Sequence, residues 1–136
     1  RLFSGNREEE VHYGRAWSAW ENALASVYSN GLSGESPGDY ARAFARLENH
    51  YFINGGFLHM DGQILANMER IAHIPGIIVQ GRYDMICPPH SAYSIHERWP
   101  NSELVMVRNA GHALSEPGIS AALVKAMDEL AEDMTA

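Results

Sequence analysis

Cysteine, cations and long apolar runs are scarce in this sequence of 136 residues. The one cysteine, Cys87, cannot form an internal disulfide, which is typical of a reducing compartment. Lys and Arg number 10 against 17 Asp and Glu, a net charge of −7, and they form no cluster. Because nucleic acids and anionic membranes are bound through clustered cations, we expect neither as a partner. No apolar stretch approaches the roughly 20 residues that span a bilayer.

The start of the sequence also lacks familiar features. It begins with Arg1 rather than Met, and no basic segment followed by an apolar core indicates a secretory signal. We therefore expect a piece of a longer protein with a cytoplasmic location. Hydrophobic residues make up 46% and charged residues 20%, which is ordinary for a globular domain and excludes a disordered tail.

The first half of the chain predicts helices, because apolar residues recur there at steps of three and four. Ser36 with Pro37 predicts the start of the second helix, as a cap followed by a first-turn proline. Asn54 to Gly56 predict the end of this second helix, and a loop rich in Ser and Gly precedes its start. Three helices are predicted, each with one apolar face. In chain order, these faces consist of Trp17, Trp20, Leu24 and Val27; of Tyr40, Phe44, Leu47 and Tyr51; and of Ile64, Leu65, Met68 and Ile71.

The second half predicts alternating strands and helices. Residues 77–79 form a short apolar strand that ends at Gly81, and residues 104–107 form a second. A helix is expected over 88–99 and another over 119–130. This order implies a parallel α/β sheet with the helices as crossovers. Two strands alone make a poor sheet, so we expect further strands elsewhere and an unstable, aggregation-prone 136-residue chain.

Asp84 and His112 are the residues with the clearest chemical potential. Each follows one of the two predicted strands, so both are expected at the carboxyl edge of the sheet, where open α/β sheets place their sites. A carboxylate beside a histidine can fix the imidazole tautomer and stabilise the imidazolium that forms during catalysis. The alternative is that Asp84 caps a turn and His112 is an ordinary loop residue.

A nucleophile for this pair is missing. In α/β-hydrolases the serine precedes the acid and the histidine, on a G-x-S-x-G turn after a strand. The segment Gly31-Leu32-Ser33-Gly34 has the wrong glycine spacing and no strand before it, so we interpret it as a surface turn. Cys87 has no neighbouring base in the sequence, and we expect it to be buried and inert. The histidines show no metal-ligand spacing, so no metal site is expected.

Several segments together resemble the C-terminal part of proline iminopeptidases, which are α/β-hydrolases also called prolyl aminopeptidases. Two of them, W-x-x-W-E and E-N-H-Y-F, are more specific to that family than the others, which many α/β-hydrolases share. The resembling segments are Trp17 to Glu21, Arg46 to Phe52, Gly81 to Asp84, Cys87-Pro88, Ala110 to His112 and Glu116 to Gly118.

The resemblance implies a serine exopeptidase that releases N-terminal proline from peptides and needs no cofactor. It implies that residues 1–72 belong to a helical cap and residues 73–136 to the closing βαβα part of the α/β-hydrolase core. Asp84 would be the acid and His112 the general base. Glu21 and Glu48 would bind the imino group of the substrate, and Phe52 would line the pocket for the proline ring. The serine is expected in the N-terminal remainder of the same hydrolase, so the isolated chain should be inactive.

Elementary chemistry supports the two glutamates in that role. An N-terminal proline carries one positive charge and two N–H donors, which two carboxylates can pair, whereas a proline inside a peptide has neither. Three alternatives stay open. Glu21 and Glu48 can be solvated helix residues, with Phe52 in the core. The enzyme can act on another ester, an amide or an epoxide. The chain can belong to a non-catalytic ligand-binding relative.

Overall fold

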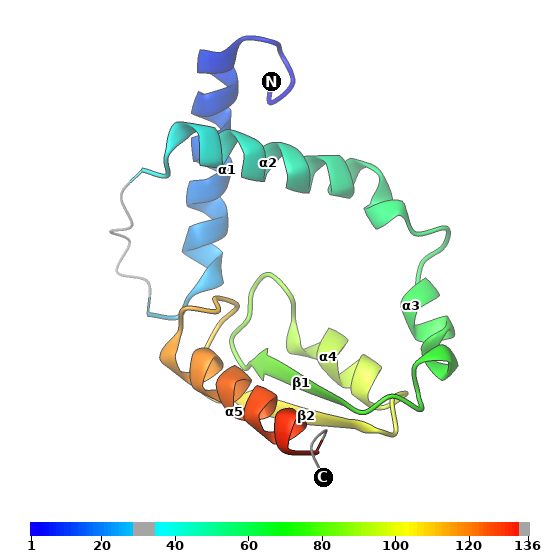
Figure 1. Cartoon of the computed structure of the whole chain (residues 1–136). Helices are drawn as coiled ribbons and strands as arrows, with labels where there is room; N and C mark the ends of the chain where they lie inside the picture. The colour runs from blue at the N-terminus through cyan, green and yellow to red at the C-terminus, as the bar shows by residue number, and fades with distance from the viewer. Residues whose placement is uncertain (29–34, 134–136) are drawn as a thin grey trace. The chain divides into compact units, whose positions relative to one another are not determined.

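The structure is a computed structural model that describes residues 1–28 and 35–133. The chain divides into two compact units, a helical one and one that contains the strands (Figure 1). The helical unit comprises Arg1–Ala23 and Ser29–Asp61, and the sheet unit comprises Leu24–Tyr28 and Gly62–Ala136. The predicted turn at Gly31 to Gly34 lies outside the described residues.

The helical unit is built on the crossing of α1 (Arg7–Ala25) and α2 (Gly38–Ile53), which the short helix η1 (Gly55–Phe57) follows (Figure 1). Small residues meet at the crossing. Gly14, Ala41 and Ala45 are buried, and a Cβ on Gly14 would lie 2.9 Å from the backbone of Ala41. Because only small side chains allow two helix backbones to approach this closely, these positions decide which face of α2 is buried.

That crossing corrects the predicted apolar face of α2. Tyr40 and Leu47 are both 60% exposed, and Tyr51 is 49% exposed, because the alanine face packs against α1 instead. Ser36 does not cap the helix either. The N-cap position is Pro37, which has no side-chain donor or acceptor.

A buried acidic residue strengthens the same unit. Glu10 is only 2% exposed, and its carboxylate pairs with the guanidinium groups of Arg42 and Arg46. The hydrogen bond from the Gly5 N–H, followed by that from Arg42, holds the pKa of Glu10 below its usual value. The carboxylate is therefore ionised and paired at neutral pH, as a buried charge must be.

The predicted third helix over Ile64 to Ile71 is interrupted. The structure has a short α3 (Gln63–Ala66) and a separate turn of 3₁₀ helix, η2 (Met68–Arg70). Between them, the Asn67 side chain donates to the Gln63 carbonyl at 2.7 Å. Such a local side-chain bond competes with the helical backbone pattern and favours ending the helix there.

The sheet unit confirms the predicted parallel pairing. Strands β1 (Gly76–Gly81) and β2 (Ser102–Val107) pair in parallel, from Gly76 opposite Ser102 to Gly81 opposite Val107. Helices α4 (Pro89–His96) and α5 (Pro117–Asp133) both contact the two strands (Figure 1). The sheet so formed brings the segments after β1 and β2 to one edge.

Helix α4 ends earlier than predicted, at His96 rather than near Trp99. The Trp99 indole N–H donates to the Ile74 carbonyl at 2.8 Å, and its ring lies against Gly76, where an added Cβ would come within 2.4 Å of it. Trp99 therefore covers the start of β1 instead of extending the helix.

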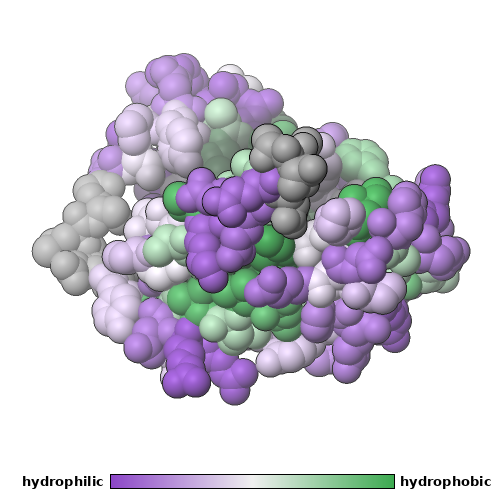
Figure 2. All heavy atoms as spheres, turned by 60° about the horizontal axis from the view of Figure 1, so that its bottom comes forward, coloured by the Kyte–Doolittle hydropathy of each residue, from purple (hydrophilic) through white to green (hydrophobic). Residues whose placement is uncertain are grey.

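Apolar side chains remain exposed on the sheet unit. In α5, Val124 is 59% and Met127 66% exposed, and Figure 2 shows hydrophobic atoms gathered among hydrophilic ones on the side that faces down in Figure 1. No helix in the described part of the chain is long and apolar enough to cross a membrane.

We expect the 136-residue chain, expressed alone, to self-associate, because exposed apolar patches and the edges of a two-stranded sheet favour aggregation. Light scattering and size exclusion chromatography at increasing concentration check this expectation. A monodisperse monomer with a single cooperative melting transition would contradict it.

Candidate active site

Asp84 and His112 meet at the carboxyl edge of the sheet. Asp84 follows β1 in a turn, and His112 follows β2 in the loop that leads to α5. The His112 Nδ1 lies 3.0 Å from the Asp84 Oδ2, which is hydrogen-bond distance. The Asp84 side chain is 6% exposed, whereas that of His112 is 42% exposed. The carboxylate is thus buried behind an imidazole that solvent or a substrate can reach.

The turn after β1 holds the Asp84 carboxylate in place. Its Oδ1 accepts hydrogen bonds from the backbone N–H groups of Ile86, at 2.9 Å, and Cys87, at 2.7 Å. This leaves Oδ2 directed at His112. Because a carboxylate only accepts, the His112 Nδ1 must carry the proton of this hydrogen bond, which leaves Nε2 as the ring nitrogen that does not contact Asp84.

Gln80, which sequence reasoning missed, also contacts this carboxylate. Its side-chain amide is buried and donates to the Asp84 Oδ2 at 3.2 Å and to the carbonyls of Gly81 and Cys87, both at 3.1 Å. Gln80 therefore links the end of β1 to the turn that carries Asp84. The available signal was one polar residue at the end of an otherwise apolar strand.

A glycine lets the histidine loop approach β1. A Cβ added to Gly81 would lie 1.9 Å from the Gly111 carbonyl oxygen and 2.7 Å from that of Ala110. The Tyr83 N–H donates to the same Ala110 carbonyl at 2.9 Å. The loop before His112 therefore lies directly on the backbone of the turn that leads to Asp84, and any larger residue at position 81 would displace it.

In the helical unit, Glu48 and Phe52 meet around a tryptophan. The Trp17 indole N–H donates to the Glu48 Oε2 at 2.6 Å. The Trp17 and Phe52 rings lie with their centroids 6.1 Å apart, and Phe52 is 62% exposed. Glu21 lies on α1 four residues after Trp17, on the same helix face, and is half-buried. The structure thus groups one carboxylate with two aromatic rings and places Glu21 one helical turn away.

Cys87 differs from its expected state, because it is exposed rather than buried. Its backbone N–H is used in the turn around Asp84, and this turn is a short surface connection to α4. The role of Cys87 in the turn depends on its backbone N–H, so its side chain can point to solvent.

No group of three His, Cys, Asp or Glu residues within the described ranges could hold a metal ion.

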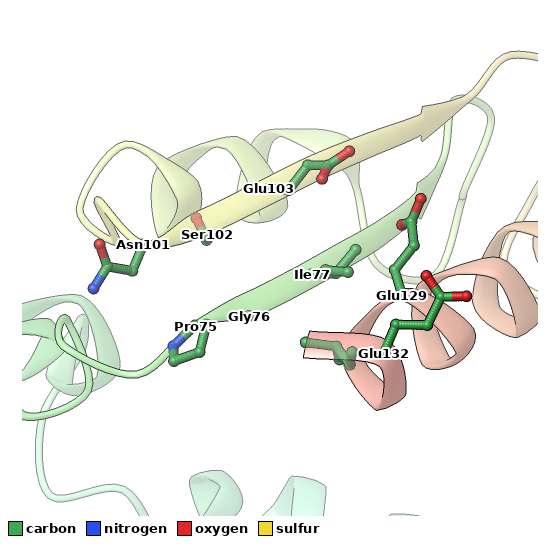
Figure 3. Close-up of a pocket in the computed structure, with 9 residues that line it drawn as sticks. Pro75, Gly76, Ile77, Asn101, Ser102, Glu103, Glu129 and Glu132 are labelled. Carbon is green, nitrogen blue, oxygen red and sulfur yellow. The ribbon is translucent and has the colours of Figure 1, made fainter. Parts of the chain in front are cut away.

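A cavity of about 500 Å³ lies at the start of the strands, where Pro75, Gly76 and Asn101 line it (Figure 3). The carboxylates of Glu129 and Glu132 reach it from α5. Because Asp84 and His112 follow the other ends of β1 and β2, this cavity is separate from their site.

Comparison with known proteins places these features in a wider group. The sequence of residues 61–134 matches an α/β-hydrolase family that is described as "TAP-like protein". The chain is 45% identical over 99% of its length to a probable proline iminopeptidase of Leptolyngbya boryana, of which it covers 43%. It is 42% identical over 96% to the proline iminopeptidase of Xanthomonas citri, covering 42%, and 45% identical over 96% to that of Arabidopsis thaliana, covering 35%. The chain thus spans less than half the length of these relatives and matches their C-terminal part.

Proposed function

Because the chain belongs to the α/β-hydrolase family described as TAP-like protein, we propose that the full-length protein is a serine exopeptidase that releases proline from the N-terminus of peptides. The observation that carries the proposal is the 3.0 Å hydrogen-bond contact between Asp84 and His112 at the carboxyl edge of the parallel sheet. The printed names of the relatives, proline iminopeptidase, support the choice of substrate.

In this proposal His112 is the general base and Asp84 the acid of a catalytic triad. With Nδ1 bonded to Asp84, Nε2 accepts the proton of a serine hydroxyl as the serine oxygen attacks the prolyl carbonyl. His112 then donates that proton to the leaving amine, and the shortened peptide departs. Water, deprotonated by the same Nε2, hydrolyses the acyl-enzyme and releases proline. The exposure of the imidazole and the burial of its partner support these roles.

The serine and the oxyanion donors are proposed to lie in a part of the protein outside these 136 residues. The one G-x-S-x-G match in the sequence, Gly34 to Gly38, leads directly into α2, and no strand among the described residues comes before it, so it lacks the strand–turn–helix context of a nucleophile elbow. We therefore expect no peptidase activity from the chain alone. In the proposed division of the whole enzyme, residues 1–72 contribute to a cap and residues 73–136 to the α/β core. The compact sheet unit of the structure also includes Leu24–Tyr28 and begins at Gly62, so these residues of the proposed cap pack with the core.

Substrate selection is assigned to the cap residues Glu21, Glu48 and Phe52. Glu48 has one carboxylate oxygen engaged by Trp17, so the carboxylate is oriented while its second oxygen can accept from a charged imino group. Phe52 presents an exposed ring that can contact the pyrrolidine ring. A proline inside a peptide has no charge to pair with the glutamates, and burying them unpaired would be costly.

A substrate panel with the full-length protein tests the proposal. We expect hydrolysis of proline p-nitroanilide, much slower hydrolysis of alanine p-nitroanilide, and none of N-acetylproline p-nitroanilide, because acetylation removes the charge and both N–H donors. A serine-directed fluorophosphonate should abolish the activity. Equal rates on the free and acetylated substrates would sink the exopeptidase assignment and favour an esterase or amidase.

The non-catalytic alternative is tested by the same reagents. A full-length protein with alanine or glycine at the elbow position would neither react with the fluorophosphonate nor hydrolyse any of the substrates.

We further propose a cytoplasmic location, which the single cysteine supports. Recovery of the full-length protein from outside the cells would contradict that location.

A further inference from the structure

Glu116 is a buried carboxylate close in sequence to His112, and the proposed mechanism does not use it. It is only 3% exposed and directly precedes the first residue of α5. Charged residues are almost never buried to this degree unless they are paired or hydrogen-bonded. In the described part of the structure no ion pair with Glu116 is found, so its hydrogen bonds must account for its burial.

The two carboxylate oxygens of Glu116 join two segments that are distant in sequence. Oε2 accepts a hydrogen bond from the Gly111 N–H, immediately before His112. Oε1 accepts from the Val27 N–H at 2.6 Å and from the Ser26 hydroxyl at 2.9 Å, and the Tyr28 N–H also bonds to the carboxylate. Glu116 therefore connects the histidine loop to the segment that leaves α1, about 90 residues earlier.

Backbone contacts between the same two segments surround this connection. The N–H groups of His112 and Ala113 both donate to the Ala25 carbonyl, each at 2.7 Å. A Cβ added to Gly111 would lie 2.9 Å from that carbonyl oxygen. The histidine loop is thus held on one side by Ala25 and on the other by Glu116, with no space for adjustment at Gly111.

The charge of Glu116 suits this arrangement. Burial by itself raises the pKa of the carboxyl, but the hydrogen bonds from Gly111, Ser26, Val27 and Tyr28 outweigh it and hold the pKa below its usual value. The carboxylate is therefore ionised at neutral pH. Replacing it would leave buried N–H donors without acceptors, which costs more than the bonds themselves contribute.

We propose that Glu116 is a positioning residue for His112: by binding the Gly111 N–H and the 26–28 segment together, it sets the place of the imidazole relative to the nucleophile. The inference rests on the proposed function only in that His112 acts as a base. It does not depend on proline as the substrate.

Glu116→Gln in the full-length enzyme tests the inference. A glutamine has one acceptor oxygen and one NH₂ group, so it must turn a donor toward either Gly111 or Val27. We expect kcat to fall about 10- to 100-fold, since a displacement of about 1 Å near the chemistry can cost about 10²-fold. KM should change less than about threefold, because the substrate-binding residues are not touched. The loss should be equal on proline p-nitroanilide and on p-nitrophenyl acetate, because both need the base.

Two further variants separate positioning from stability. Ser26→Ala removes one hydrogen bond to the Glu116 Oε1 and leaves the bond from the Gly111 N–H to Oε2 intact. Its loss in kcat should therefore be much smaller than that of Glu116→Gln. Glu129→Gln removes a charge from an exposed ion pair with Lys125 in α5 and should leave kcat unchanged. A Glu116→Gln enzyme that folds and retains full kcat would overturn the proposal.

If Glu116→Gln does not fold, hydrogen exchange in the wild-type enzyme decides. We expect the amide of Gly111 to be protected as strongly as those of β2, because it donates to a buried acceptor. Rapid exchange at Gly111 would show that the bond does not persist and would overturn the proposal. A wild-type enzyme that cleaves the ester but not the proline substrate would count against the proposed substrate alone.

Discussion

Replacing Asp84 with Asn in the full-length enzyme is expected to lower kcat about 10⁴-fold, the loss seen when a triad histidine is held in the wrong tautomer. The N–H groups of Ile86 and Cys87 both point at the Oδ1 position, so the carbonyl oxygen of the asparagine will stay there. Its NH₂ group must then occupy the Oδ2 position and face the Nδ1 of His112. The imidazole will accept that bond, carry its own proton on Nε2, and be unable to take a proton from a serine.

Steady-state kinetics with proline p-nitroanilide and p-nitrophenyl acetate measure this loss, and it should affect both substrates. Asp128→Asn, an exposed change of the same chemistry in α5, serves as the control and should retain wild-type rates. A melting temperature close to that of the wild type would show that the fold is intact. A folded Asp84→Asn enzyme with less than about a tenfold loss would remove Asp84 from the triad.

The second large effect concerns selectivity. Glu48→Gln is expected to lower kcat/KM for proline p-nitroanilide about 10²-fold, since truncating one partner of a buried, charged hydrogen-bonded pair costs about 2–5 kcal/mol. The amide oxygen of glutamine can still accept from the Trp17 indole, so the side chain should keep its place while its charge is lost. The rate on p-nitrophenyl acetate should change little, because that ester has no ammonium group to bind.

The ratio of the two losses is the informative quantity. Glu8→Gln, an exposed change in the first turn of α1, is the matched control and should leave both rates unchanged. Equal losses on the amine and the ester would show that Glu48 supports the fold rather than the substrate. That outcome would favour an α/β-hydrolase acting on a different ester, amide or epoxide.

Local sequence patterns predicted the sheet unit well. The apolar run before Gly81, the second run at 104–107 and the following helix correspond to β1, β2 and α5. Their alternation was sufficient to predict parallel pairing, because short connections through helices allow few other arrangements. The proximity of Asp84 and His112 then followed from topology, since both come directly after neighbouring parallel strands.

The helical unit was predicted less well. Large apolar residues of α2 suggested its buried face, but Ala41 and Ala45 are buried instead, against Gly14. A periodic pattern records which residues are apolar, whereas burial depends on which surfaces fit together. Small residues carry a weak hydrophobic signal, although they permit the closest packing of helices.

The amino-acid sequence by itself determined the α/β class, the parallel strand pair and the sheet edge at which an acid and a histidine meet. Each of these features depends on local periodicity and on chain connectivity. Only the tertiary structure decided which groups hold that pair. Gln80 donates to Asp84 across a turn, and Glu116 binds the segment at 26–28 from about 90 residues away. Such contacts are set by the packing of distant backbone segments, where unpaired N–H groups must find acceptors once water is excluded, and no spacing along the chain encodes them.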